Sequence, residues 1–167
     1  MSKKVERNYL EINSLRDLND SNIFSHGYSV ELVKPVNFQI NKFFYKNIGK
    51  NHHWIDRLVW TDKQWMEYIS SETVDTYVLK KDEDIAGYFE LIHHNSKREV
   101  EIAYLGLLEE YQNKKLGSYL LSSAIKNSFT KKTKRVWVHT CSLDHKNALT
   151  NYISRGMKIF KKETVEL

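Results

Sequence analysis

The residue pattern changes twice between residues 100 and 141, and this change constrains the fold more than any other feature of the chain. VEIAYLGLL (100–108) is β-rich, KLGSYLLSSAIKNSF (115–129) has apolar residues at helical spacing, and RVWVHTC (135–141) is β-rich again. A strand–helix–strand unit needs a right-handed crossover, which favours parallel pairing of its two strands. The sequence therefore predicts a parallel pair inside the sheet.

The segments before this unit predict antiparallel strands and two helices. DTYVLKK (75–81) and IAGYFELIHH (85–94) are β-rich and bounded by short charged turns, as in a meander. FQINKFFYKNI (38–48) has an apolar side at helical spacing, and a second short helix is expected to start after Thr61. We therefore expect an α/β fold with a mixed, mostly antiparallel sheet and helices on both faces.

The two ends of the chain add further elements. YSVELV (28–33) predicts a strand that stops at Pro35, and KIFKKETVEL at the end is also strand-like. Between RVWVHTC and this last segment we expect a helix with Asp144 as its N-cap and Gly156 as its terminator. Because no repeat, low-complexity tract or Pro/Gly/Ser linker divides the sequence, we expect a single domain over residues 1–167.

Composition restricts the partners and the compartment. The net charge of +5 favours an anionic partner, either nucleic acid or a phosphorylated cofactor. No apolar run approaches the ~20 residues of a membrane span, and MSKKVERNYL lacks the apolar region of a signal peptide, so no membrane association is expected. The single cysteine, Cys141, cannot form an internal disulfide, which fits a reducing cytoplasm.

The stretch LEEYQNKKLGSYLL (107–120) contains a candidate anion site at the start of a helix. Helix N-termini present free N–H groups and a partial positive charge. Gly117 would let a diphosphate approach the backbone, and Lys114 and Lys115 add charge. A solvated basic turn would give the same pattern, and the sequence has neither a P-loop nor a G-x-G-x-x-G motif. Both interpretations stay open at the level of these residues.

Two longer stretches resemble a known family. EIAYLGLLEEYQNKKLGSYLLSSAI resembles the acetyl-CoA-binding motif of the GNAT superfamily of N-acetyltransferases, in which a strand is followed by Q/R-x-x-G-x-G/A and a helix. ALTNYISRGMKIF resembles the superfamily's second motif, A-x-x-x-Y-x-x-x-G-F. The resemblance covers about residues 75–161, which would form the cofactor-binding core. HHWIDRLVWTDKQW, in an N-terminal segment (about 1–74) expected on the acceptor side, resembles a bacterial subgroup less closely.

The chain departs from the family motifs at two positions. Lys115 stands where the first motif has its first glycine, and if the turn needs a positive φ there, lysine costs about 1 kcal/mol. His145 stands where an asparagine is expected three residues before Ala148, although Asn147 lies close by. The first departure concerns the geometry of the turn, and the second concerns one cofactor contact.

The resemblance implies acetyl-CoA as cosubstrate and assigns residues to it. In the superfamily the two central parallel strands splay apart, and the pantetheine arm of the cofactor lies between them. Backbone groups near the end of the first strand would hold this arm and stabilise the thioester oxyanion. The diphosphate would lie on the turn at residues 112–118. The implied cofactor-binding residues are Leu107, Leu108, Gln112, Asn113, Lys114, Lys115, Leu116, Gly117, Ser118 and Asn147.

The resemblance also implies catalytic residues. Glu101 stands where several members place a catalytic base, and strict alternation would place it on one face with Ala103 and Leu105. Glu90, on the neighbouring predicted strand, is the second candidate carboxylate. Tyr152 occupies the family's tyrosine position and would protonate the leaving thiolate. The alternatives are a surface glutamate and a tyrosine that only packs its helix on the sheet.

NHHWIDRLVW (51–60) is a candidate acceptor segment. Trp54 and Asp56 would shape a pocket for an amine and pair with its charge, with Glu90 as a third tentative contact, or the segment would simply staple the core. The histidine pairs 52–53 and 93–94 do not predict a metal site, because adjacent histidines in a strand point to opposite faces and no cysteine or further histidine cluster supports them.

The resemblance implies an acetyl-CoA-dependent N-acetyltransferase that transfers acetyl directly to a primary amine, most simply of a small molecule. A protein or peptide amine, or a non-catalytic acyl-CoA-binding module, are the alternatives. Nucleic acid is not the expected partner, because the basic run KNSFTKKTKR (126–135) contains only one aromatic residue, Phe129. The edge strands of the predicted sheet would allow a homodimer.

Overall fold

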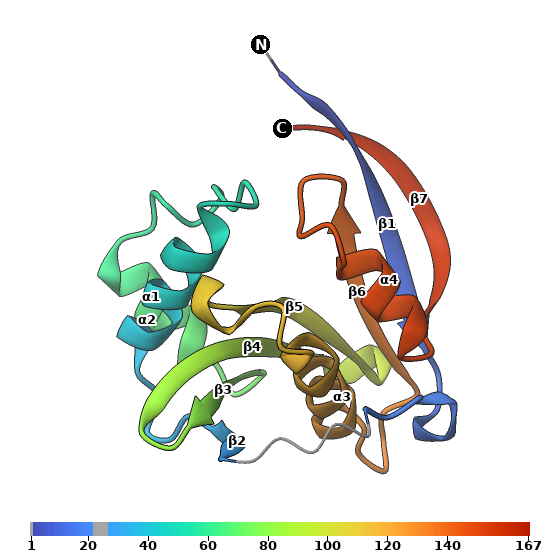
Figure 1. Ribbon diagram of the computed structural model, residues 1–167, viewed down its shortest axis with the longest axis horizontal. Coiled ribbons are helices and arrows are strands. Elements are labelled where there is room, and N and C mark those ends of the chain that lie inside the picture. The colour runs from blue at the N-terminus through green and yellow to red at the C-terminus, as the bar shows by residue number, and fades with distance from the viewer. Residues whose placement is uncertain (1, 22–26) are drawn as a thin grey trace.

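The computed structural model describes residues 2–21 and 27–167. A seven-stranded sheet forms its centre, with the strand order β2-β3-β4-β5-β6-β1-β7. Figure 1 shows β1 and β7 continuing beyond the helices as a long ribbon that carries both termini. The strands are β1 (Lys4–Ile12), β2 (Tyr28–Leu32), β3 (Val74–Lys81), β4 (Asp84–His94), β5 (Glu99–Leu107), β6 (Arg135–Cys141) and β7 (Lys158–Glu166).

The sheet has the predicted mixed pairing. β2, β3, β4 and β5 form an antiparallel meander, and β6, β1 and β7 also pair antiparallel. β5 and β6 pair in parallel, at the crossover predicted from the change of pattern. This pairing covers only Glu99 to Glu101 on β5, after which the two strands diverge (Figure 1). The splayed parallel pair expected from the family resemblance is therefore confirmed.

Helices cover both faces of the sheet. α1 (Phe38–Gly49) and α2 (Asp62–Ile69) lie on one face, and α3 (Leu116–Ser128) and α4 (Ala148–Ser154) belong to the other. Alternation along β3 directs Val78 toward α1 and Leu79 into the larger core under α3. Thr61 caps α2 in a capping box with Gln64, as its position in the sequence predicts. No helix in the described part of the chain is long and apolar enough to cross a membrane.

The first strand, β1, was not predicted from the sequence. It lies inside the sheet between β6 and β7, so the N-terminus completes the C-terminal half of the fold. Val5, Leu10 and Ile12 are its buried residues, and they do not recur at every second position along the strand. The β1–β7 pairing has a bulge whose extra residue, Phe160, lies in β7, and β1 itself keeps a continuous register with β6 from Arg7 to Ile12. Val5 therefore lies on the opposite face from Leu10 and Ile12, and no single apolar face identifies the strand in the sequence.

The predicted N-cap of the last helix is wrong. α4 starts at Ala148, with Asn147 in the cap position and no side-chain cap. Asp144 instead accepts hydrogen bonds from the Cys141 backbone N–H at 3.0 Å and from the Thr140 hydroxyl. It closes the turn after β6 rather than starting the helix.

Candidate active site

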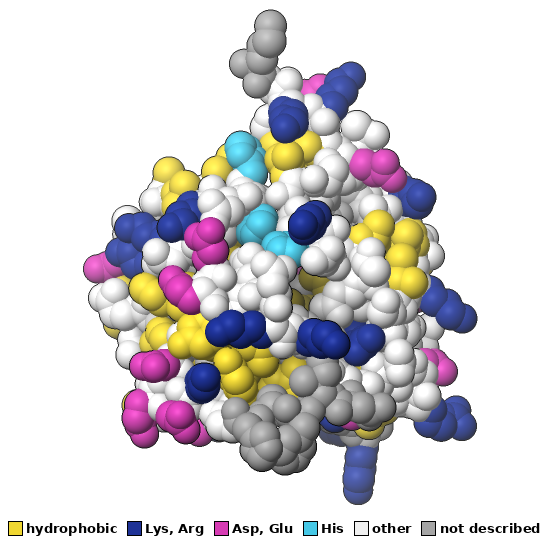
Figure 2. All heavy atoms as spheres, in the orientation of Figure 1, with side chains coloured by type: hydrophobic (Ala, Val, Ile, Leu, Met, Phe, Trp, Pro, Cys, Tyr) yellow, Lys and Arg dark blue, Asp and Glu magenta, His cyan; other side chains and the backbone are white. Residues whose placement is uncertain are grey.

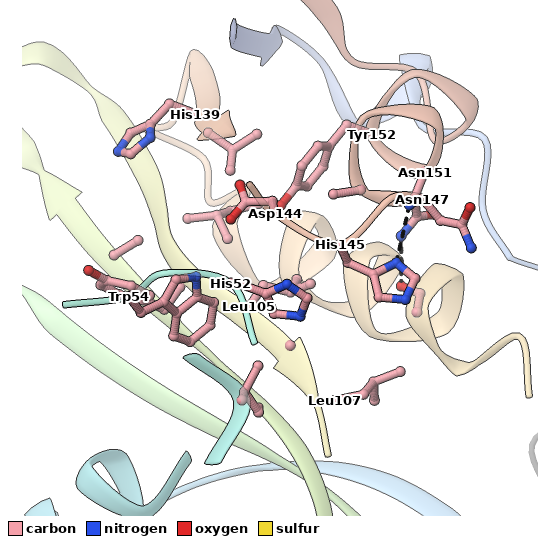
Figure 3. Close-up of a pocket in the computed structure, with 18 of the residues that line it drawn as sticks. His52, Trp54, Leu105, Leu107, His139, Asp144, His145, Asn147, Asn151 and Tyr152 are labelled. Atoms are coloured by element: carbon pink, nitrogen blue, oxygen red, sulfur yellow. Dashed lines mark hydrogen bonds between the residues drawn. The ribbon is translucent and has the colours of Figure 1, made fainter. Parts of the chain in front are cut away.

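The divergence of β5 and β6 opens a cleft of about 1070 Å³. We call it the central cleft. Figure 3 shows side chains from β5 and the α1–α2 loop on one side and from β6 and α4 on the other, directed into the same space. Beyond Glu101, β5 has lost its partner β6 but keeps β4, so alternate N–H and C=O groups on its free edge face the gap. Such an edge can pair with an extended amide-containing ligand.

The start of α3 forms one end of the central cleft. Lys115 precedes the helix in the left-handed region at φ 63°, and Asn113 has φ 62°. No side chain of the described residues caps α3, so its first N–H groups remain available to a ligand. A Cβ on Gly117 would meet only Asn151 Nδ2, at 3.7 Å, and larger side chains there would extend into open space beside these N–H groups. The backbone at this turn therefore suits an anion.

Most of the predicted cofactor-binding residues line the cleft, and three do not. The residues that line it are Leu107, Gln112, Asn113, Lys115, Gly117, Ser118 and Asn147. Leu116 is buried in the core and Lys114 points elsewhere, with its ammonium over the Tyr111 ring. The backbone N–H of Leu108 donates to Ala86 O at 2.9 Å, so this group is already used within the protein.

Sequence reasoning missed a polar stripe on α4. Asn151 lies in the cleft wall and donates from Nδ2 to the Gly117 carbonyl at 3.1 Å, which ties α4 to the turn (Figure 3). Arg155 also lines the cleft, and its buried Nε has no hydrogen-bond partner among the described residues. Asn147, Asn151 and Arg155 follow at intervals of four, a helical spacing that could have revealed them. Asn151 therefore holds α4 against the start of α3, and Arg155 adds a positive charge to the same cleft.

Glu101 lines the opposite part of the cleft, where β5 leaves β6. Its side chain is 17% exposed, and Oε1 lies 3.0 Å from His94 Nε2. The prediction that Glu101 shares a face with Leu105 is wrong. Between Ile102 and Tyr104 the strand contains one residue more than β4, and this bulge at Ala103 reverses the alternation. Leu105 consequently packs against the α3 core, while Glu101 faces the other side.

Tyr152 reaches into the cleft from α4, toward Asp144 (Figure 3). The side chain is buried, at 8% exposure. Burial raises the pKa of the phenol, and the Asp144 carboxylate raises it further. The phenol is therefore a neutral proton donor over the whole physiological range.

Glu90 does not line the cleft. It is fully buried and forms an ion pair with Arg57 at 2.9 Å. Tyr68 and Asn41 also donate to it, at 2.7 Å and 3.0 Å. The Arg57 guanidinium lies 4.2–5.9 Å from the centres of five aromatic rings, those of Tyr45, Trp60, Trp65, Tyr68 and Tyr104.

This buried pair anchors the acceptor segment. Trp54 and Asp56, which precede Arg57, both line the cleft. The Trp54 ring packs on Tyr104 with centroids 4.8 Å apart, and its Cβ lies so close to Gly49 that no side chain would fit there. The segment therefore packs against the core and also contributes to the cleft wall, and its contact with an amine stays a prediction.

Histidines gather at the cleft. His52, His53, His139 and His145 line it, four of the seven in the chain. Figure 2 shows histidine side chains near the centre of one face, with Lys and Arg side chains below them. Burial lowers the pKa of His139 and of His145, and neighbouring cations lower both further. Within the part of the chain that the structure describes, no group of three or more His, Cys, Asp or Glu is arranged to hold a metal.

The fold resembles those of several solved structures. A GCN5-related N-acetyltransferase from Kribbella flavida superposes with a TM-score of 0.67 at 14% identity, over 96% of this chain and 56% of that one. A GCN5-related N-acetyltransferase from Sphaerobacter thermophilus superposes with a TM-score of 0.75 at 12% sequence identity, over 99% of this chain and 52% of that one. An aminoglycoside acetyltransferase from an uncultured soil metagenomic sample superposes with a TM-score of 0.64 at 12% sequence identity, over 78% of this chain and 88% of that one. The chain thus spans little more than half the length of the first two proteins, and identities this low show the fold alone.

The sequence itself decides the family. No curated protein matches the chain. Residues 38–157, well over half of it, match the model of the acetyltransferase (GNAT) family. The matched range includes the turn before α3, the splayed strand β5 and the helix that carries Tyr152. The chain belongs to the GNAT acetyltransferase family.

Proposed function

We propose that the protein is an acetyl-CoA-dependent N-acetyltransferase that transfers acetyl directly to the primary amine of a small molecule. The observation that carries this proposal is the start of α3, which no described side chain caps and which opens into the central cleft. This helix N-terminus, together with Lys115 and Arg155, supplies positive potential for a diphosphate. Carboxylates of Asp56 and Glu101 line another part of the cleft, where they would pair with a cationic amine, and Arg7 and Arg57 line the cleft as well.

The residues present fit acetyl-CoA. The turn at residues 113–118 would hold the diphosphate through backbone N–H groups, with Arg155 and Lys115 adding charge. The free edge of β5 between Ile102 and Leu107 would pair with the amides of the pantetheine arm. Acetyl-CoA, when bound, supplies the activated thioester.

Two residues of the chain would handle protons. An amine must be neutral to attack, and we assign Glu101 as the base that takes its proton, directly or through one water. We assign Tyr152 as the donor to the sulfur that leaves, because its phenol stays protonated and is directed into the cleft. Glu90 is not assigned as a base, since both its oxygens are used by Arg57, Asn41 and Tyr68.

The acceptor would lie between Trp54, Asp56 and Glu101. Aromatic faces and carboxylates together favour cationic amines over neutral ones. The similarity in fold to an aminoglycoside acetyltransferase makes polyamines and amino sugars reasonable first compounds to test. Protein or peptide amines are the alternative acceptors, and acyl-CoA binding without transfer is the alternative function.

The test measures free thiol released from acetyl-CoA in the presence of diamines, amino sugars, amino acids and a lysine peptide. We expect turnover with at least one cationic small molecule. Glu101→Gln should lower kcat on the order of a hundredfold, and Tyr152→Phe should lower it at least ~3-fold, both with unchanged acetyl-CoA affinity. Tight acetyl-CoA binding without turnover on any amine would favour the binding module instead.

A further inference from the structure

A histidine and the candidate base form a pair at the edge of the central cleft. His94 Nε2 lies 3.0 Å from Glu101 Oε1, across the antiparallel strands β4 and β5. The His94 ring also stacks on Trp137, with centroids 6.0 Å apart and planes inclined by 20°. The imidazole is therefore held by a hydrogen bond at one edge and by a ring at one face, which fixes its orientation.

Glu101 lies on the cleft side of this pair, and His94 lies on the solvent side. Glu101 lines the central cleft and is 17% exposed, whereas His94 does not line it and is 37% exposed. A carboxylate oxygen accepts hydrogen bonds, so the tautomer that makes this contact carries its hydrogen on Nε2, and Nε2–H donates a hydrogen bond to Oε1. Oε2 has no hydrogen-bond partner among the described residues, and it is the oxygen left for the amine.

We infer that His94 is a positioning residue for the transfer reaction: its Nε2–H holds Oε1 and thereby presents Oε2 of Glu101 to the acceptor amine. This inference rests on the proposed function. In the transfer step the amine nitrogen forms a bond to the acetyl carbon, the C–S bond breaks, Oε2 takes the proton of the amine, and Tyr152 gives a proton to the sulfur. His94 changes no bond in this scheme and acts only through Glu101.

The neighbouring histidine is a matched control. His93 Nε2 lies 2.9 Å from Asp75 Oδ2, so it makes the same kind of contact as His94. Because successive residues of a strand point to opposite faces, the side chains of His93 on β4 and Asp75 on β3 lie on the other face of the sheet from His94, and neither lines the cleft. Substitution of His93 therefore tests for general effects of removing a histidine–carboxylate pair.

The experiment compares His94→Phe, His94→Gln and His93→Phe, using the acceptor with the highest turnover in the wild type. His94→Phe should lower kcat about tenfold, with the KM for acetyl-CoA unchanged, because it removes a hydrogen bond to a charged group. His94→Gln keeps an N–H donor at similar reach and should restore kcat to within about twofold of the wild type. His93→Phe should leave kcat unchanged.

A double-mutant cycle separates positioning from a structural role. In a Glu101→Gln background, His94→Phe should have no further effect on kcat, because the group it positions is gone. An equal loss in both backgrounds, or a kcat for His94→Phe within about twofold of the wild type, would overturn the inference while leaving the proposed function intact.

A second measurement does not depend on turnover. The ¹⁵N chemical shifts of the His94 ring should report one tautomer, protonated at Nε2, and Glu101→Ala should convert it to a mixture. A mixture already in the wild type would refute the contact. If no amine is a substrate, the proposed function fails, and the tautomer alone decides whether the pair exists as described.

Discussion

Lys115 is the residue at which the turn before α3 stores strain. Its φ of 63° lies in the left-handed region, where a side chain costs about 1 kcal/mol relative to glycine. The family motif has glycine here, and the structure shows why: the chain must turn sharply so that the first N–H groups of α3 face the cleft. The backbone conformation is kept although the residue that favours it is absent.

Replacing this lysine should therefore stabilise the protein. Lys115→Gly is expected to raise the free energy of unfolding by about 0.5–1 kcal/mol, measured by urea denaturation. Acetyl-CoA affinity, measured by calorimetry, should be equal or better, because backbone N–H groups make the contacts to the diphosphate and the relief of backbone strain offsets the charge that Lys115 adds. Lys114→Gly is the matched control, since Lys114 has no positive φ and should gain nothing. Equal effects of the two substitutions would contradict the argument.

Gly117 tests the anion site itself. Its Cβ position is open, so Gly117→Val should fold, but its two methyl groups would cover the N–H groups at the start of α3. We expect acetyl-CoA to bind at least ~10-fold more weakly, about 1.4 kcal/mol, in calorimetric titration. Gly117→Ala should lie between the valine variant and the wild type. Unchanged affinity of the valine variant would refute the site.

Single residues of the site differ in how far the sequence reveals them. The turn could be located because a glycine, two lysines and a change from strand to helix coincide within a few positions. Asn151 and Arg155 were missed because each is an ordinary residue of a helix until α4 is known to face the cleft. The direction of Glu101 could not be predicted, because it depends on the bulge at Ala103, which leaves no mark in the sequence.

At the scale of elements, the buried pair between Arg57 and Glu90 joins the α1–α2 loop to β4. Removing one partner leaves the other charged and without compensation in the core. Arg57→Met should lower the free energy of unfolding by about 3–5 kcal/mol, measured by chemical denaturation, and should raise the KM for the acceptor more than that for acetyl-CoA, because Trp54 and Asp56 are carried by the same loop.

A surface pair provides the comparison. Lys42 and Asp62 form an ion pair at 3.0 Å between α1 and α2, and the Asp62 side chain is 65% exposed. Asp62→Asn should cost less than about 1 kcal/mol, because water screens the pair. If Arg57→Met and Asp62→Asn destabilise the protein equally, the buried pair does not anchor the loop.

The elements themselves were largely predictable. In the described residues, all four α-helices and six of the seven strands follow from periodicity and turn or cap residues, and the parallel pairing follows from the strand–helix–strand unit. β1 was the exception, because its buried residues Val5, Leu10 and Ile12 do not all lie on one face and so do not give the alternation that identifies a strand. The bulges in β5 and β7 are consequences of strand pairing across the sheet, and a single segment of sequence does not contain that information.

At the scale of the whole molecule, acid should destabilise the fold through two histidines of the cleft, His139 and His145. Burial lowers the pKa of His139 below its ordinary value of 6.5, and Arg7 lowers it further. The pKa of His145 is lowered by burial, His52 and Lys146. Between the lowered pKa values and 6.5, the unfolded chain binds more protons than the native protein. Stability should therefore be full above this window and fall as the pH drops through it.

Carboxylates extend the same trend to lower pH. A hydrogen bond from Lys126 lowers the pKa of Asp20, and one from Tyr9 lowers that of Glu163. These groups contribute stability above their ordinary values, and the contribution is lost as the pH falls through their lowered pKa values. Stability should accordingly fall in two stages, the first governed by histidines and the second by carboxylates.

The measurement is the free energy of unfolding from urea denaturation between about pH 8 and about pH 5, where only the first stage acts. The free energy of unfolding of the wild type should fall toward pH 5. Its slope against pH should correspond to the uptake of fewer than two protons on unfolding, because two histidines contribute. His139→Gln with His145→Gln should flatten this slope, since neither position then binds a proton in the unfolded state. A wild type whose stability is constant across this range, or a double variant with an undiminished slope, would show that these histidines are not held neutral by the fold.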